Sequence, residues 1–190
     1  MSNKERCQWV TDDLIYQKYH DEEWGIPSFD DRYLFEMLTL EGAQAGLSWL
    51  TILKRRDNYR KAFANFDIQT VSQYDEMQVQ KLLNNKGIIR NKLKIRSVIT
   101  NAKVILNIQK EFASFANYIW GFVDGKPIIN HWQSANEVPA YTKESIELSK
   151  DMKKRGFSFV GPTICYAFMQ ATGMVNDHEK CCFLYQKGEE

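Results

Sequence analysis

Hydrophobic residues recur at helical spacing along most of this chain. In the segment 91–112 they return every three or four positions, as on one face of a helix. The same spacing predicts helices over 30–43, 46–66, 74–87, 91–112, 113–122, 142–156 and 162–173. No stretch alternates polar and apolar residues as a half-buried strand does. The pattern therefore predicts an all-α fold of seven or eight helices behind an irregular N-terminal segment.

Residues that favour helix ends stand at the limits of these segments. Asn91 and Thr142 are suited to cap two helix starts, and Pro162 fits the first turn of another. Gly87 and Gly173 stand where two helices are expected to stop. These end signals support the helical reading.

The composition is that of one soluble domain. Of 190 residues, 44% are hydrophobic and 26% charged, and no apolar run approaches the roughly 18 residues that cross a bilayer. The N-terminus carries no apolar signal region, so we expect a cytoplasmic protein without membrane association. In that compartment the four cysteines are expected to be free thiols or metal ligands.

Positive charge is unevenly distributed, although the net charge is only +1. Eight Lys or Arg and no acid lie between positions 77 and 110, and residues 54–56 and 153–155 form two more basic clusters. One such cluster is usually a solvated helix face. Three clusters in a nearly neutral chain favour a phosphate-binding face.

Two Cys–His pairs stand at opposite ends of the chain. His178 and Cys182 are four residues apart, which places them on one face of a helical turn, and Cys7 and His20 supply a second pair. Two cysteines and two histidines form a common closed zinc set, in which the ion is structural. The alternative is that the cysteines are small core residues and the histidines lie at the surface. Cys181 competes with Cys182, because i+3 also faces His178.

A carboxylate lies among aromatic residues in the first fifty positions. Glu41 shares the apolar face of its helix with Met37 and Leu38, where an unpaired charge costs several kcal/mol. An ordinary backbone or arginine partner would satisfy it. The nearby aromatic residues are Trp9, Tyr16, Tyr19, Trp24 and Trp49. Aromatic walls that sandwich a flat ring, with a carboxylate at its amino edge, indicate a base pocket, most favourable for a cationic ring.

A basic helix end, a short glycine-bounded hairpin and a new helix follow one another over 153–169. Such a helix–hairpin–helix directs backbone amides at a phosphate and adds charge from the preceding helix, although similar hairpins also serve as plain connections. The residues concerned are Lys153, Lys154, Arg155, Val160, Gly161 and Thr163.

In combination, these stretches resemble the 3-methyladenine DNA glycosylase I family, bacterial base-excision-repair enzymes of the helix–hairpin–helix superfamily. The resemblance runs from "ERCQWV" to "CCF" and rests on "YHDEEWG", "LEGAQAGLSWLTILKRR", "KGIIRNKLKI" and "KRGFSFVGPTICYAFMQATGMVNDH". It implies one DNA glycosylase domain over 1–190. A helical core over 31–173, with its hairpin near 153–169, would be joined to terminal segments 1–30 and 174–190 tied by zinc.

The resemblance also implies roles for individual residues. One structural zinc ion per chain would be held by Cys7, His20, His178 and Cys182. Glu41 would read the amino edge of a flipped alkylated adenine, stacked on Tyr19 and Trp49 and surrounded by Tyr16, Trp9 and Trp24. Gly46 and Leu47 would lie near the gap left by the flipped nucleotide, while the hairpin, with Lys154, Arg155, Val160, Gly161 and Thr163, grips the phosphate backbone.

The expected reaction is hydrolytic removal of 3-methyladenine from alkylated double-stranded DNA by a monomer, with the free base as product. No lysine follows the hairpin helix where a Schiff base would form, so no lyase activity is expected. The superfamily usually places an aspartate after that helix, but here the nearest, Asp177, adjoins the predicted ligand His178. Two rivals are a non-enzymatic, zinc-stapled domain that binds damaged DNA and a zinc hydrolase acting on a small molecule.

Overall fold

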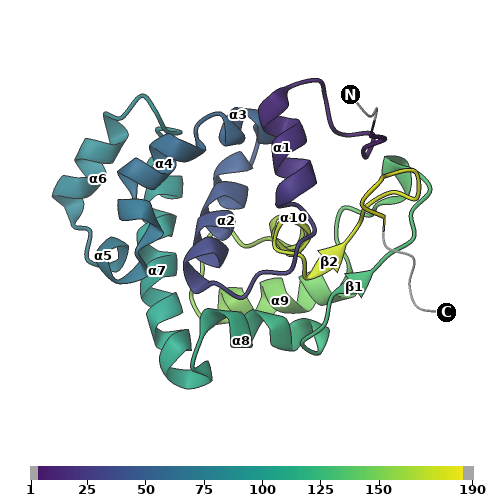
Figure 1. Ribbon diagram of the computed structural model, residues 1–190. Coiled ribbons are helices and arrows are strands. Elements are labelled where there is room, and N and C mark those ends of the chain that lie inside the picture. The colour runs from purple at the N-terminus through teal and green to yellow at the C-terminus, as the bar shows by residue number, and fades with distance from the viewer. Residues whose placement is uncertain (1–3, 186–190) are drawn as a thin grey trace.

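The computed structural model describes residues 4–185, and most of them lie in helices (Figure 1). The α-helices of this part are α1 (Leu14–Glu22), α2 (Asp31–Gln44), α3 (Trp49–Leu53), α4 (Arg56–Ala62), α5 (Ile68–Ser72), α6 (Glu76–Leu83), α7 (Lys92–Phe112), α8 (Phe115–Trp120), α9 (Lys143–Lys154) and α10 (Pro162–Ala171). Three 3₁₀ turns are η1 (Ala64–Phe66), η2 (Gly121–Val123) and η3 (Ala135–Glu137). The predicted all-α class is confirmed. No helix among these residues is long and apolar enough to cross a membrane.

One small element was not expected from the sequence. β1 (Ile128–Ile129) and β2 (Val175–Asn176) pair in parallel. At two residues each they are too short to produce a readable alternation. The pair matters because β2 leads directly into the C-terminal loop that contains His178 (Figure 1).

The predicted continuous helix over 46–66 is wrong, because the segment breaks into α3, α4 and η1. The last break has a packing cause. Phe63 and Phe66 are both fully buried, and the chain turns through left-handed backbone angles at Ala64 and Asn65 to bring both rings inward. Such angles are uncommon for residues other than glycine and hard to foresee from a hydrophobic pattern.

The N-terminal segment was predicted to be irregular, yet residues 14–22 form α1. Asp13 caps it by accepting a hydrogen bond from the Ile15 amide. Leu14 is 79% exposed, whereas the buried residues of the helix are Tyr19 and His20. The helix has no aliphatic stripe to reveal it, because its buried side carries functional rather than aliphatic side chains. The short α5 was missed as well.

Helix α2 is the centre of the fold (Figure 1). Every residue from 34 to 43 is buried, and the helix packs against α3, α7, α8 and α10. Its first residue, Asp31, also caps α8 by accepting hydrogen bonds from the Phe115 and Ala116 amides. Glu41 therefore sits on a helix that is buried over residues 34–43 and packed on several sides.

The chain between α1 and α2 crosses the end of α10 at very short range. Gly25 N donates to Gln170 O and Ser28 N donates to Thr172 O. Gly173 has a φ of +71°, and a Cβ there would lie 2.3 Å from the Ile26 carbonyl carbon. Only glycine accommodates both the backbone angle and the approach.

We therefore expect Gly173→Ala to lower the free energy of unfolding by about 3 kcal/mol or more, because strain and a backbone clash coincide. Urea denaturation measures the change. Gly121→Ala is the matched control, since Gly121 has φ −60° and open space around its Cα. It should change stability by less than about 1 kcal/mol. Equal effects of the two substitutions would contradict this account of the crossing.

Candidate active site and metal centre

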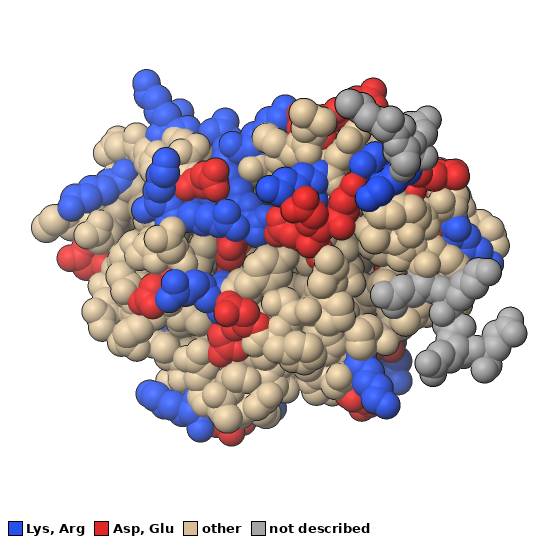
Figure 2. All heavy atoms as spheres, viewed as in Figure 1, with Lys and Arg blue, Asp and Glu red and all other residues tan. Residues whose placement is uncertain are grey.

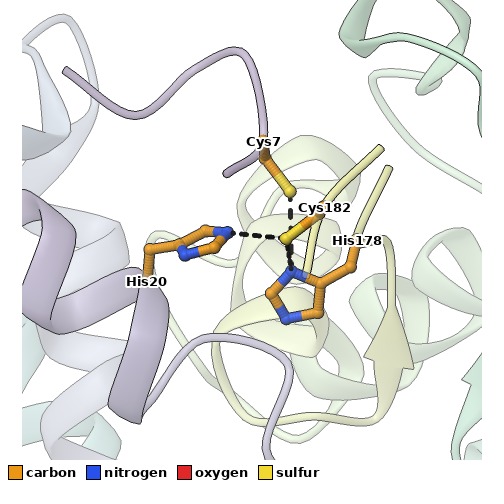
Figure 3. A group of neighbouring side chains, drawn as sticks. All are labelled: Cys7, His20, His178 and Cys182. Atoms are coloured by element: carbon orange, nitrogen blue, oxygen red, sulfur yellow. Dashed lines mark hydrogen bonds between the residues drawn. The ribbon is translucent and has the colours of Figure 1, made fainter. Parts of the chain in front are cut away.

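Four buried side chains from both ends of the chain converge on one point (Figure 3). Cys7 comes from the segment before α1, His20 from α1, and His178 and Cys182 from the loop after β2. Their ligand atoms all lie within 4.8 Å of one another. Cys182 joins this Cys/His cluster, whereas its neighbour Cys181 is exposed and Cys165 is buried elsewhere, beside Met152.

The spacing of the cluster suits a tetrahedral ion. Cys7 Sγ lies 3.5 Å from His178 Nδ1, and Cys182 Sγ lies 3.4 Å from His20 Nε2 and 3.5 Å from His178 Nδ1. Bonds of about 2.3 Å to sulfur and about 2.0–2.1 Å to nitrogen, at tetrahedral angles, separate the donor atoms by about 3.5 Å. The donor set and its geometry therefore fit a metal ion with four protein ligands.

Both histidine rings are oriented from behind. His20 Nδ1 lies 2.8 Å from Asp21 Oδ1, and Arg6 holds that carboxylate with two hydrogen bonds of 2.8 and 2.7 Å. His178 Nε2 lies 3.2 Å from the Trp24 carbonyl oxygen. These contacts leave His20 Nε2 and His178 Nδ1 facing the two sulfur atoms, which is the arrangement of outer partners typical of metal-bound imidazoles.

The pKa values of the two thiols are shifted in opposite directions. Hydrogen bonds from Cys7 and from the two imidazoles lower the pKa of Cys182 below its ordinary value. The hydrogen bond to Cys182 and burial raise the pKa of Cys7. A bound cation would favour the thiolate form of both cysteines.

A cavity of about 320 Å³ opens beside the cluster. It is lined by all six residues predicted for a base pocket, Trp9, Tyr16, Tyr19, Trp24, Glu41 and Trp49. The Tyr19 and Trp49 ring centroids lie 5.4 Å apart, and Trp9 contacts both Tyr16 and Trp24 at 5.0 and 4.9 Å. The cavity is therefore a largely aromatic chamber with a size suited to one heterocyclic ring.

Glu41 is the distinctive polar group of this chamber. Its side chain is buried and accepts no hydrogen bond from any described residue. Desolvation alone raises its pKa to about 8. A carboxyl group placed this way, without the partner expected of an ordinary buried acid, is available to a ligand.

The nitrogen of a second pocket residue also lacks a partner. Trp49 Nε1 is buried and makes no hydrogen bond within the described part of the chain. Tyr16 and Tyr19 have pKa values raised by burial and, to a lesser extent, by Glu41, so both phenols stay protonated near neutral pH. Neutral hydroxyl and indole groups of Tyr16, Tyr19 and Trp49 thus line the cavity with the Glu41 carboxyl.

Asp177 also lines the cavity, but its carboxylate is already occupied. It accepts hydrogen bonds from Asn130 Nδ2, Trp132 Nε1, Tyr166 Oη and Gln170 Nε2. Four donors saturate a carboxylate. Asp177 therefore joins the loop after β1 to α10 and β2, and it is poorly placed to stabilise a passing cation.

Sequence reasoning missed several other lining residues, namely Gln44, Ala135, Val138, Ala167, Gln170 and Glu179. Gln44 was detectable, since it lies three residues after Glu41 on α2 and so shares its face. Ala135 and Val138 carry no chemical signal. They reach the cavity only because the loop after β1 folds over it.

A second hollow of about 260 Å³ adjoins the chamber. It shares Glu41, Gln44 and Ala167 with the first cavity and is bordered by Gly46, Leu47 and Thr163. The turn after α2 and the start of α10 thus flank the approach to Glu41. Leu47 is 40% exposed at this edge.

The hairpin between α9 and α10 is held from two helices. Asn101 of α7 donates to Ser158 O and accepts from Ser158 N, and Ser149 Oγ donates to Val160 O. Val160 is buried, and Gly161 caps α10 in extended conformation. The hairpin is therefore anchored to both α7 and α9.

The basic clusters are partly neutralised within the molecule. Arg155 pairs with Asp151 and Glu111, and Arg56 with Glu23 and Glu36. Figure 2 shows Lys and Arg gathered over α3 and α4, with acidic residues among them. Lys154 is exposed.

A family model described as methyladenine glycosylase matches residues 9–185. The DNA-3-methyladenine glycosylase 1 of Escherichia coli (strain K12) is 48% identical over 181 residues, covering 95% of this chain and 97% of that protein. The chain belongs to the methyladenine glycosylase family. The family predicted from the sequence is confirmed.

Solved structures agree with this methyladenine glycosylase assignment. A crystal structure of 3-methyladenine DNA glycosylase I matches with a TM-score of 0.94 and 50% identity, covering 96% of this chain and all of that one. The Staphylococcus aureus 3-methyladenine DNA glycosylase I, solved to explain 3-methyladenine recognition, matches with a TM-score of 0.93 and 34% identity, covering 97% and 98%.

The Cys/His cluster predicts that this glycosylase-family protein purifies with one tightly bound divalent ion per chain. Removal of the ion by a chelator should lower the Tm by about 10 °C or more, because a metal with four ligands contributes several kcal/mol to folding. Elemental analysis and thermal unfolding test this. Cys182→Ser should lose the ion. Cys181→Ser, one position away, should keep it, and a metal-free parent protein would contradict the assignment.

The raised pKa of Glu41 predicts a pH-dependent stability cost. The folded-state pKa of about 8 exceeds the ordinary value of 4.5, so the stability contributed by the neutral acid is complete below pH 4.5 and is lost as pH rises through about 8. We expect Glu41→Gln to stabilise the protein more at pH 9 than at pH 5, by roughly 3–5 kcal/mol from the size of the shift. Unfolding at several pH values measures this difference. The exposed Glu22→Gln should show no such trend.

Proposed function

We propose that the protein is a DNA repair glycosylase that flips 3-methyladenine out of alkylated double-stranded DNA and hydrolyses its N-glycosyl bond, releasing the free base. The observation that carries the proposal is Glu41, a desolvated carboxyl without a protein partner inside an aromatic chamber. The functions named for the relatives support the same conclusion.

Charge complementarity explains why such a pocket would select this base. Methylation at N3 makes adenine cationic, and a carboxylate with acceptor oxygens binds both that charge and the exocyclic amine. We assign the stacking roles to Tyr19 and Trp49, because Glu41 lines the same cavity. Tyr16, Trp9 and Trp24 complete the aromatic wall and favour a cation over its neutral parent.

The proposed DNA contacts surround the second hollow. Leu47, with Gly46 before it, would enter the gap left by the flipped nucleotide. The amides of Val160, Gly161 and Thr163 would approach a backbone phosphate at the start of α10, with Lys154 and Arg155 adding charge. Of the two side chains, Lys154 suits this role better, because Arg155 is engaged by Asp151 and Glu111.

The bond is broken by hydrolysis in this proposal, without lyase activity. No lysine is among the lining residues of the chamber in the described chain, so no amine is at hand to attack the sugar. The positive charge of the base already weakens the glycosidic bond. Holding the base and admitting water then suffices for departure, and Asp177 with its four donors need not act on the sugar cation.

We further propose that the ion of the Cys/His cluster is zinc, held by Cys7, His20, His178 and Cys182, and that the protein works as a cytosolic monomer. Zinc prefers this mixture of sulfur and nitrogen ligands. Bound there, it supplies a structural link between the chain ends. Four protein ligands leave no position for a reacting water, which argues against a zinc hydrolase.

The remaining rival is a domain that binds damaged DNA without cutting it. Such a protein would share the hairpin and the metal but would have no use for a costly buried acid. Glu41 therefore favours the enzyme.

Release of free base from methylated DNA, followed by chromatography, tests the proposal. We expect Glu41→Gln to lower kcat/KM by roughly 10²-fold or more, because it removes the negative charge that holds the cationic base in the chamber before the bond breaks. The exposed Glu22→Gln serves as the control for loss of an acid nearby. A parent protein that binds alkylated DNA but releases no base would establish the rival.

A further inference from the structure

The link from α2 to α3 is a tight turn of defined type. Leu47 N donates to Gln44 O at 2.6 Å, Ala45 has φ −45° and ψ 114°, and Gly46 has φ +80°. These values define a type II turn, which needs glycine at its third position. Leu47 is the fourth residue, so its direction depends on this turn.

Type I and type II turns differ mainly in the orientation of the central peptide unit. In this turn that unit joins Ala45 to Gly46, and the Ala45 carbonyl oxygen marks its orientation. The side chain of Lys94 is bonded to that oxygen, with its Nζ atom at 2.7 Å. The same ammonium group donates to Ala43 O at 2.9 Å. The Lys94 ammonium group is therefore hydrogen-bonded to both the end of α2 and the central peptide of the turn.

Lys94 differs in this respect from its basic neighbours. Lys92 and Arg96 lie on the same helix, α7, and both pair with Glu76 at its surface. Lys94 has no acidic partner among the described residues and instead caps the carboxyl end of α2, where free carbonyls and the helix dipole favour a cation. Desolvation lowers the pKa of Lys94, in keeping with a partly enclosed ammonium group.

The backbone of Lys94 is also well anchored, at the start of α7. α7 begins at Asn91, whose side chain accepts from the Lys94 amide, and Ile95 beside it is buried in the core. The ammonium group is thus held at a constant place relative to α2. Because Lys94 lies at the anchored start of α7, its side chain can stabilise the conformation of the turn.

We propose that Lys94 is a positioning residue for DNA engagement. It locks the Ala45–Gly46 peptide in the type II orientation and so presents Leu47 to the duplex. Because the N–H and C=O of a trans peptide point in opposite directions, the same lock turns the Gly46 N–H away from α7. That amide has no acceptor within the described residues and is free to receive a phosphate oxygen. The inference rests on the proposed role of the turn in DNA binding.

Binding to three probes distinguishes this role from a general effect on stability or charge. The probes are a duplex with a stable abasic-site analogue, the same duplex undamaged, and free 3-methyladenine. Lys94→Met should weaken binding to the abasic duplex at least about tenfold. Without the lock on the turn, the Leu47 side chain, which acts as the wedge, no longer fits the gap in the duplex. Binding of free 3-methyladenine, which needs only the chamber, should change less than about twofold.

Lys92→Met is the matched control, because it removes one positive charge from the same helical turn. It should weaken binding to both duplexes by the same factor, as loss of a general phosphate attraction does. Lys94→Arg, which retains donors for both carbonyls, should recover most of the preference for the abasic duplex. If Lys94→Met does not fold, as loss of free-base binding would reveal, Lys94→Gln takes its place.

A double-mutant cycle with Leu47→Ala decides whether Lys94 acts through the wedge. Once Leu47 is truncated, Lys94→Met should have little further effect on abasic-duplex affinity, so the two changes are not additive. Additive losses, or a Lys94→Met protein that keeps its preference for the abasic duplex, overturn the inference. A parent protein with no such preference and no base release would instead overturn the proposed function.

Discussion

The aromatic chamber depends on the contacts that join the two ends of the chain. Trp9 stands in its wall, yet the segment before α1 has no helix among its described residues. Arg6 joins that segment to Asp21 of α1. The segment is joined to the C-terminal loop by Cys7 in the Cys/His cluster and by two hydrogen bonds. In these the Gln8 amide donates to the Glu179 carboxylate and the Phe183 amide donates to the Glu5 carbonyl. A few hydrogen bonds of about 1 kcal/mol each offset little of the entropy of closing so long a loop. A metal bound by the four residues of the cluster would provide the larger contribution.

The cluster and the chamber also share side-chain contacts, so the tie sets more than the path of the backbone. The His20 ring lies 5.3 Å from Trp9, and the His178 ring meets Trp24 edge-on at 4.8 Å. An ion that fixed the two imidazoles would therefore also fix the two indoles that line the cavity. Such rigidity would suit the proposed role of Glu41, whose carboxyl has no partner until a ligand binds. Support comes from Arg56, which joins Glu23 after α1 to Glu36 of α2 and so holds these two chamber-forming elements together.

The sequence predicted those features that depend on rare residue types in a recognisable pattern. It did not predict features that depend on tertiary packing. The Cys–His spacing and the position of Glu41 on an apolar face could be recognised in the sequence, because thiols, imidazoles and core-facing acids are rare. Helix α1 could not, since its buried positions are Tyr19 and His20 rather than aliphatic residues. The split of 46–66 arose from the tertiary demand to bury Phe63 and Phe66 together. The saturation of Asp177 needed donors from 130, 132, 166 and 170, which only the folded chain brings together.

Under the proposed function, the energetic cost of ionising the buried Glu41 explains selectivity for a cationic over a neutral adenine. Near neutral pH the empty chamber favours the protonated acid, because its pKa is about 8. A cationic ring offsets the cost of ionising Glu41 by pairing directly with this buried carboxylate. A neutral adenine cannot, so it either leaves a buried unpaired charge or meets a neutral acid that binds it more weakly. Discrimination then follows from desolvation and does not require a close steric fit to one methyl group, which alone is worth only about 1–3 kcal/mol.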